Sequence, residues 1–178
     1  MNIILIGFMG SGKSSMGIKL SYQMKQPYLD TDKEIERTSG KKISEIFEQD
    51  GEPAFRRMEH DMIMSFLEKG ISNHVISTGG GLAVNEDNWE PLKKLGVVVW
   101  LRIRPETVME RLSGDKNRPL LQTEDRETRI RELMEYRDPF YKGCSDIIVD
   151  VDNKPSERIM DEIFTKAAGA NKKKKRKR

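Results

Sequence analysis

A glycine-rich segment near the N-terminus carries the residues most suited to binding phosphate. It reads Gly7-Phe8-Met9-Gly10-Ser11-Gly12-Lys13-Ser14, which fits the pattern G-x-x-x-x-G-K-[ST] between an apolar run and an amphipathic one. Glycines let backbone N–H groups point inward around phosphate oxygens, and the start of a helix favours negative charge. Lys13 is placed to reach the β- and γ-phosphates, and Ser14 to ligate Mg²⁺. A ligand-free glycine turn needs neither the lysine nor the hydroxyl, so the segment predicts a nucleoside triphosphate site.

Two other patterns limit the chemistry at this site. Asn153-Lys154-Pro155-Ser156 begins like the guanine-reading sequence N-K-x-D, but Ser156 stands where the aspartate belongs, so we do not expect guanine specificity. The apolar run His74–Thr78 does not end in the acidic residue that helps to hold Mg²⁺ in many P-loop proteins. The metal carboxylate must therefore come from elsewhere.

Three clusters of residues that could bind a ligand follow predicted strands or open a predicted helix. They are Asp30-Thr31-Asp32, Phe55-Arg56-Arg57-Met58-Glu59 and Gly79-Gly80-Gly81. Because open α/β sheets bind ligands at the carboxyl ends of their strands, these clusters are candidates for an acceptor site. Structural alternatives remain open for each. The aspartates favour a helix N-terminus, Arg56 has Glu52 and Glu59 within ion-pair spacing, and the glycines suit a tight turn.

The elements that would position these residues alternate between apolar runs and amphipathic segments, which is typical of an α/β protein with a parallel sheet. We predict strands near Asn2–Gly7, Pro27–Asp30, His74–Thr78, Val97–Arg102 and Asp146–Val151. We predict helices near Lys13–Met24, Pro53–Lys69, Asp87–Leu95, Pro105–Leu112, Arg126–Tyr141 and Pro155–Ala168. Continuous apolar strands indicate helices on both faces of the sheet, hence a three-layer α/β/α fold with five parallel strands.

Length and composition set the remaining bounds. The chain has 178 residues, which suits one domain, and no apolar run of membrane-spanning length. Cys144 is the only cysteine, so neither an internal disulfide nor a cysteine-built metal site is expected. The last seven residues are all basic; without them 25 basic and 29 acidic residues give a net charge of −4. We therefore expect no nucleic-acid partner for the globular part, a disordered basic tail over residues 169–178, and a cytoplasmic protein.

Taken together, the motifs resemble those of the shikimate kinases. That family has the P-loop, D-x-D, F-R-x-x-E and G-G-G in this order and at similar spacing. Arg118-Pro119-Leu120-Leu121 looks like its lid signature, and Arg137-x-Pro139-x-Tyr141 looks like its second arginine site. The similarity covers roughly residues 1–168. It implies a P-loop kinase domain over that range, with an acceptor-binding segment at about 31–60 and a lid at about 113–124.

The resemblance also implies roles for particular residues. The metal ligands would be Ser14 and Asp30, and the catalytic residues would be Lys13, Asp32 and Arg118. The acceptor would be bound by Asp32, Arg56, Gly79, Gly80, Gly81 and Arg137. ATP would be bound by Gly10, Ser11, Gly12, Lys13, Ser14, Ser15, Arg111, Arg118 and Pro155. Arg111 and Pro155 match the family positions that sandwich the adenine, although an exposed helical arginine and a helix-opening proline need no ligand.

The implied reaction is transfer of the γ-phosphoryl group of ATP to the 3-hydroxyl of shikimate by a monomer with one Mg²⁺. Two alternatives stay open at this point. One is another P-loop metabolite kinase, such as a gluconate kinase or a small nucleotide kinase, although a nucleotide acceptor would also need a base pocket. The other is a regulator that uses ATP as a switch.

Overall fold

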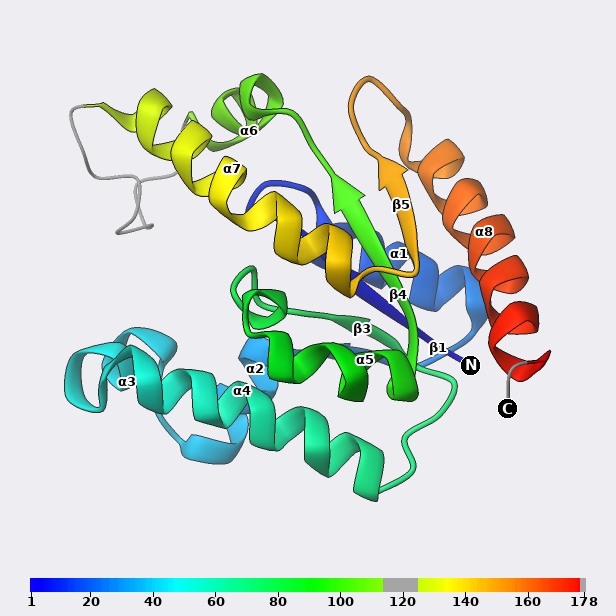
Figure 1. Cartoon of the computed structure of the whole chain (residues 1–178), viewed down its shortest axis with the longest axis horizontal. Coiled ribbons are helices and arrows are strands. Elements are labelled where there is room, and N and C mark those ends of the chain that lie inside the picture. The colour runs from blue at the N-terminus through cyan, green and yellow to red at the C-terminus, as the bar shows by residue number, and fades with distance from the viewer. Residues whose placement is uncertain (114–124, 177–178) are drawn as a thin grey trace.

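The chain folds around a five-stranded parallel sheet that lies between two layers of helices (Figure 1). The computed structural model describes residues 1–113 and 125–176. The strands are β1 (Asn2–Ile6), β2 (Tyr28–Asp30), β3 (Val75–Ser77), β4 (Gly96–Arg102) and β5 (Ile147–Asp150), in the order β2-β3-β1-β4-β5. All five residues of β1 are buried. This burial is why the strand is a continuous apolar run rather than an alternating one.

Two helices form one layer, and three helices form the other. Helices α1 (Lys13–Met24) and α8 (Ser156–Arg176) pack together on one face of the sheet. The other face is covered by α4 (Gly51–Glu68), α5 (Trp89–Leu95) and α7 (Arg126–Cys144). The shorter helices lie at the rim: α2 (Thr31–Ser39) and α3 (Ile43–Gln49) contact α4, and α6 (Pro105–Leu112) contacts α7. Two 3₁₀ turns, η1 (Leu82–Val84) and η2 (Glu86–Asn88), precede α5.

The predicted three-layer fold and all five strands are confirmed. Helices α1 and α6 have the predicted bounds, and Pro105 opens α6 at its first position. The differences lie at element ends and in the segment after β2, where the structure has α2 and α3 in addition to the six helices predicted above. The predicted helix Asp87–Leu95 begins as η2, and α7 extends beyond the predicted end at Tyr141 to Cys144. Within residues 1–113 and 125–176, no helix combines the length and hydropathy needed to cross a membrane.

The predicted disordered tail is wrong over residues 169–176, because α8 continues through Arg176. Lys174 explains how this basic end is held against the body. Its ammonium bonds the Asp146 carboxylate at 2.6 Å and the carbonyl oxygens of Gly96 (2.7 Å) and Lys93 (2.9 Å). One lysine thus finds three acceptors near the amino end of β4, which compensates for the charge density of the run.

The strand order places the candidate ligand-binding residues together at the carboxyl ends of the strands. Chain connections run from β1 outward to β2 on one side, and from β3 across β1 to β4 on the other, so β1 marks the point where the winding reverses. Such a point opens a crevice at the carboxyl ends of the strands. The P-loop follows β1 there, and Asp30, the last residue of β2, pairs in register with Ser77 at the end of β3.

Candidate active site

The loop after β1 has the backbone that its glycines predict. Gly7, Gly10 and Gly12 have φ values of 141°, 78° and 87°, a region that other residues seldom adopt. A Cβ at Gly7 would also lie 2.7 Å from the carbonyl oxygen of Leu101. Gly12 is the N-cap of α1, so the loop delivers its backbone directly to the start of the helix. This geometry suits an anion at the helix N-terminus.

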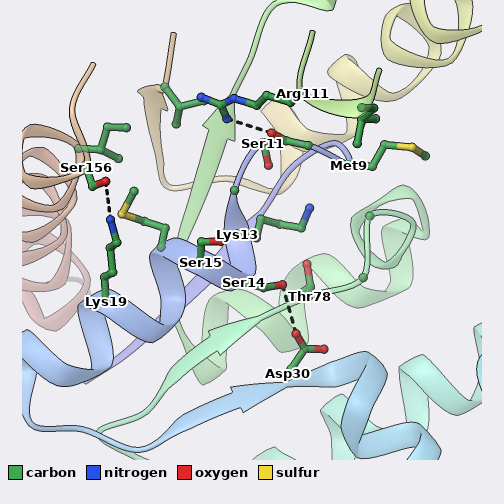
Figure 2. A pocket seen from close by; sticks show the side chains of 18 of the residues that line it. Met9, Ser11, Lys13, Ser14, Ser15, Lys19, Asp30, Thr78, Arg111 and Ser156 are labelled. Carbon is green, nitrogen blue, oxygen red and sulfur yellow. Dashed lines mark hydrogen bonds between the residues drawn. The ribbon is translucent and has the colours of Figure 1, made fainter. Parts of the chain in front are cut away.

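A cavity of about 580 Å³ lies over this loop (Figure 2). It is lined by the P-loop, by the ends of β2 and β3, by α6, and by the β5–α8 turn. The predicted site residues among its lining are Gly10, Ser11, Gly12, Lys13, Ser14, Ser15, Asp30, Asp32, Gly79, Gly80 and Arg111. The fold therefore brings eleven of the predicted residues, from four segments of the chain, around one space.

Lys13 and Arg111 place positive charge at the loop. Lys13 Nζ donates to the carbonyl oxygens of Gly7 (2.7 Å) and Phe8 (3.0 Å), so the ammonium is turned back over the loop. Arg111, on α6, donates from Nη1 to the carbonyl oxygen of Gly10 at 2.9 Å. These two cations come from separate segments of the chain, the start of α1 and the end of α6. Both residues line the cavity and bring positive charge to it.

Ser14 and Asp30 form the oxygen pair suited to Mg²⁺. Ser14 Oγ lies 3.4 Å from Asp30 Oδ2, while Asp30 Oδ1 accepts from the backbone N–H groups of Asp32 and Lys33. Asp30 thus caps α2 with one oxygen and faces the P-loop with the other. Among the described residues there is no cluster of three or more histidine, cysteine or acidic side chains that could hold a metal. One hydroxyl and one carboxylate fit a magnesium ion that takes its remaining ligands from phosphates and water.

Two carboxyl groups sit beside each other deeper in the site. Burial, together with the nearby charge of Asp30, raises the pKa of Asp32 to about 6 against the opposing attraction of Lys13 and Arg56. Burial likewise raises the pKa of Glu59 to about 7, against the attraction of Arg56. A Cβ on Gly79 would lie 2.5 Å from Asp32 Oδ1 and 3.1 Å from Glu59 Oε1. Only glycine leaves room for both carboxyl groups at this point.

The other two glycines of the triplet stand against the two predicted arginines. A Cβ on Gly81 would lie 2.5 Å from Arg56 Nη2, and a Cβ on Gly80 would lie 3.7 Å from Arg137 Nη1. The carbonyl oxygen of Gly80 also accepts from Tyr141 at 2.6 Å, which fixes the triplet against α7. The fold therefore brings Asp32, Arg56 and Arg137 together around Gly79–Gly81, and we call these residues with Glu59 the acceptor cluster.

Arg56 forms the ion pairs with Glu52 and Glu59 that the sequence spacing allowed. Its Nη1 donates to Glu59 Oε2 at 2.6 Å, and its Nε and Nη2 both donate to Glu52 Oε1, at 3.2 and 2.7 Å. Glu59 is 1% exposed, whereas the Glu52 side chain is 61% exposed. The buried partner orients the guanidinium, and the exposed partner occupies the side that faces solvent.

Several buried polar atoms of the acceptor cluster have no hydrogen-bond partner in the described part of the chain. They are Asp32 Oδ1, Glu59 Oε1 and Arg137 Nε. Unsatisfied buried groups are costly, and in a native protein they point to a ligand, an ion or water. Two acceptor oxygens and one cationic donor here match a ligand that carries both hydroxyl groups and a negative charge.

Four predicted site residues of the described part of the chain lie outside the cavity lining. Arg56, Gly81 and Arg137 belong to the neighbouring acceptor cluster, which joins the cavity through Asp32, Gly79 and Gly80. Pro155 precedes α8 and is not in the lining, although Lys154 and Ser156 on either side of it are. Arg118 and residues 114–124 of the predicted lid lie outside the described residues.

Sequence reasoning missed some residues that the structure brings into the site. Glu59 was visible as the last residue of F-R-x-x-E, but the sequence indicated only an ion-pair partner. Its burial beside Asp32 required the fold. Lys19 and Ser156 line the cavity and bond each other at 2.6 Å across 137 positions, and no local pattern signals such a pair.

Fold and site together define a P-loop kinase, in which a phosphate-binding loop faces a separate acceptor cluster. The sequence profile described as shikimate kinase matches residues 9–168. The chain belongs to the shikimate kinase family and is an ATP-dependent kinase.

Individual relatives agree with this assignment. The chain is 43% identical to the shikimate kinase of Caldanaerobacter subterraneus, over 92% of this chain and 94% of that protein. It is 44% identical to the Persephonella marina enzyme, over 92% and 96%. The Acinetobacter baumannii shikimate kinase solved in complex with shikimate superposes with a TM-score of 0.82 at 36% identity, covering 92% of this chain and 90% of that one. A deoxyadenosine kinase from M. mycoides (TM-score 0.57, 17% identity, 95% and 99% covered) shares the fold alone.

Proposed function

We propose that this kinase transfers the γ-phosphoryl group of ATP to the 3-hydroxyl of shikimate, giving shikimate 3-phosphate and ADP in aromatic amino-acid biosynthesis. The observation that carries the proposal is the acceptor cluster. Two carboxyl oxygens and a guanidinium Nε are buried there with no hydrogen-bond partner among residues 1–113 and 125–176, beside the Arg56 guanidinium. Shikimate has one carboxylate and three hydroxyl groups. Arginines suit the carboxylate through paired N–H donors, and Asp32 suits the hydroxyls.

The proposed chemistry needs little covalent help from the protein. The shikimate oxygen attacks the γ-phosphorus as the bond to the β–γ bridging oxygen breaks, and the hydroxyl proton passes to Asp32. Asp32 is at the boundary between the acceptor cluster and the cavity, since it contacts Gly79 and also lines the cavity. Lys13 offsets the charge of the transferring group. We assign a further cation to Arg118 in the proposed lid, residues 113–124, which would exclude water as a competing acceptor.

The nucleotide end of the site follows from the cavity lining. Gly10, Ser11, Gly12, Lys13, Ser14 and Ser15 would hold the phosphates, with Arg111 and Pro155 on either side of the adenine. Ser14 and Asp30 would hold one Mg²⁺ against the β- and γ-phosphates, where the ion neutralises charge when bound. Asp30 serves in place of an acidic residue after β3, because it ends the strand next to β3. The acceptor segment of about 31–60 supplies Asp32 and Arg56.

We further infer that the enzyme works as a monomer. This inference is supported because one chain supplies all the residues of both the nucleotide cavity and the acceptor cluster. A cytoplasmic setting supplies ATP and keeps thiols reduced, which suits the single, buried Cys144. Sedimentation velocity at working enzyme concentration tests the monomer directly.

A coupled ADP-release assay tests the proposed reaction. The purified full-length protein is supplied with ATP and Mg²⁺ and with shikimate, quinate, gluconate or a nucleoside monophosphate in turn. We expect ADP production to be stimulated by shikimate and to be abolished in Lys13→Ala with every acceptor. Phosphorus NMR of the product identifies the esterified hydroxyl. Stimulation by another acid, or hydrolysis that ignores all of them, would rule out shikimate as the substrate.

A further inference from the structure

The end of the nucleotide cavity away from the P-loop is built by α1 and the start of α8. Met16 and Lys19 of α1 line it. Lys19 shares a helix face with Ser15, which lies in the first turn of α1 beside the P-loop, because the two residues are four positions apart. Ser156 and Ile159 of α8 line the same end. The two helices are joined there by Lys19, whose Nζ donates to Ser156 Oγ at 2.6 Å (Figure 2).

Position along α1 tells which part of a nucleotide this end would meet. Lys19 follows Lys13 by six residues, which is about 9 Å along a helix axis. The phosphates are expected at the first turn of α1, where Gly12 caps the helix. A nucleotide that extends from the loop toward α8 would therefore bring its sugar and base, not its phosphates, to Lys19.

The hydrogen-bonding capacity of Lys19 is only partly used. An ammonium has three N–H donors, and across residues 1–113 and 125–176 the Lys19 ammonium has one hydrogen bond, to Ser156. Lys154, the other lysine at this end, is engaged differently, because its Nζ pairs with Glu162 at 2.7 Å. Lys19 is thus the cation at this end that bonds a neutral hydroxyl and keeps donors for a ligand.

We propose that Lys19 is a nucleotide-positioning residue that determines affinity for the nucleoside part of ATP. It holds Ser156, and with it the β5–α8 turn, against the helix that begins at the P-loop. Its remaining N–H donors bond an acceptor atom of the ribose or the base. The inference rests on the proposed function only in taking ATP as the nucleotide, and it does not depend on the acceptor.

Direct binding measurements separate the nucleoside from the phosphates. Calorimetry gives Kd for ADP and for inorganic tripolyphosphate, without acceptor, in the wild type, Lys19→Ala and Lys172→Ala. Lys172 is exposed on α8, so its replacement removes the same charge far from the cavity. We expect Lys19→Ala to weaken ADP about three- to tenfold and to leave tripolyphosphate unchanged. Equal weakening of both ligands, or no change in ADP, would overturn the proposal.

A double-mutant cycle tests whether Lys19 acts partly through Ser156. Because the two side chains share one bond, Ser156→Ala should weaken ADP less than Lys19→Ala, and the double variant should resemble Lys19→Ala. Lys19→Arg, which keeps a donor, should retain most of the ADP affinity. Fully additive losses would refute the shared role. Thermal unfolding without ligand checks that the variants fold.

The test remains informative whatever the acceptor is. At saturating ATP, kcat and the shikimate KM should match the wild type in the control Lys172→Ala. A wild type that binds ADP but is not stimulated by shikimate would defeat the proposed function and leave this inference standing. The reverse result, normal shikimate turnover with unchanged ADP affinity in Lys19→Ala, would defeat the inference alone.

Discussion

Arg56 has two carboxylate partners with different roles: one orients its guanidinium, and the other occupies the side where a substrate could bind. Its guanidinium is shared between a buried carboxylate, Glu59, and an exposed one, Glu52. Removing one partner of a buried pair costs about 3–5 kcal/mol, whereas an exposed pair contributes about 0–1 kcal/mol. An incoming substrate carboxylate should therefore replace Glu52 and leave Glu59 in place.

This competition predicts a gain of affinity from one substitution. Glu52→Gln removes the charge that competes with shikimate, so we expect the shikimate KM to fall about two- to fivefold, with kcat and the ATP KM unchanged. Glu68→Gln, at the far end of the same helix, is the matched control. Steady-state kinetics with shikimate varied decides the matter. A higher shikimate KM in Glu52→Gln would mean that Glu52 helps to hold the substrate.

The opposite substitution tests the arginine itself. Arg56→Ala should raise the shikimate KM about ten- to a hundredfold, since charge-assisted hydrogen bonds contribute about 1.5–3 kcal/mol. Arg57→Ala provides the control, because Arg57 is adjacent but exposed and outside the cluster. Both shikimate and ATP are varied in the kinetics. Loss of ATP affinity in Arg56→Ala would place the acceptor site elsewhere.

Element positions followed from the sequence because each depends on local pattern. Continuous apolar runs predicted the buried strands, and the glycine-lysine motif fixed the start of α1 at Lys13. The predicted strands placed the candidate residues at one end of the sheet, but the sequence did not predict which side chains contact each other there. The pairing of Gly79 with Asp32, and of Gly81 with Arg56, joins segments tens of residues apart. The bond between Lys19 and Ser156 is a similar case.

The end of α8 shows the limit of composition as a guide. Seven consecutive basic residues predict disorder when taken alone, because like charges repel and no apolar face is present. What the sequence could not reveal was the group of acceptors around Lys174: Asp146, Gly96 and Lys93. The tertiary contacts of Lys174 outweigh the repulsion between neighbouring basic side chains, and the segment is helical.

That explanation predicts a stabilising role for this helical end. Lys174→Ala should lower the free energy of unfolding by roughly 1–2 kcal/mol and the Tm by about 2–8 °C. Turnover at moderate temperature should not change, because these contacts lie at the amino end of β4, opposite the cavity. Lys173→Ala, whose side chain is exposed, is the control. Scanning calorimetry with parallel activity assays measures both. Equal Tm values for the two variants would exclude the contact as the cause.

At the scale of the whole molecule, the acceptor cluster sets a conflict between activity and stability. The folded protein raises the pKa of Asp32 to about 6 and that of Glu59 to about 7. A carboxyl group with a raised pKa binds its proton more tightly in the folded chain than in the unfolded one. Its stabilising contribution is therefore complete at low pH, below the unfolded value, and is lost as pH rises through the folded value.

Asp32→Asn removes one of these titrations and so exposes the conflict. Relative to the wild type, the variant should gain unfolding free energy as pH rises from 5 to 7.5, by on the order of 1 kcal/mol. The same substitution should abolish shikimate phosphorylation, because the amide cannot accept the hydroxyl proton. In the wild type, kcat/KM for shikimate should fall as pH drops through about 6, where Asp32 becomes protonated. Urea unfolding at both pH values, beside a pH–rate profile, measures the two effects. If the variant gained no stability between pH 5 and 7.5, ionisation of Asp32 would not destabilise the fold, and the burial of its carboxyl group would need another explanation.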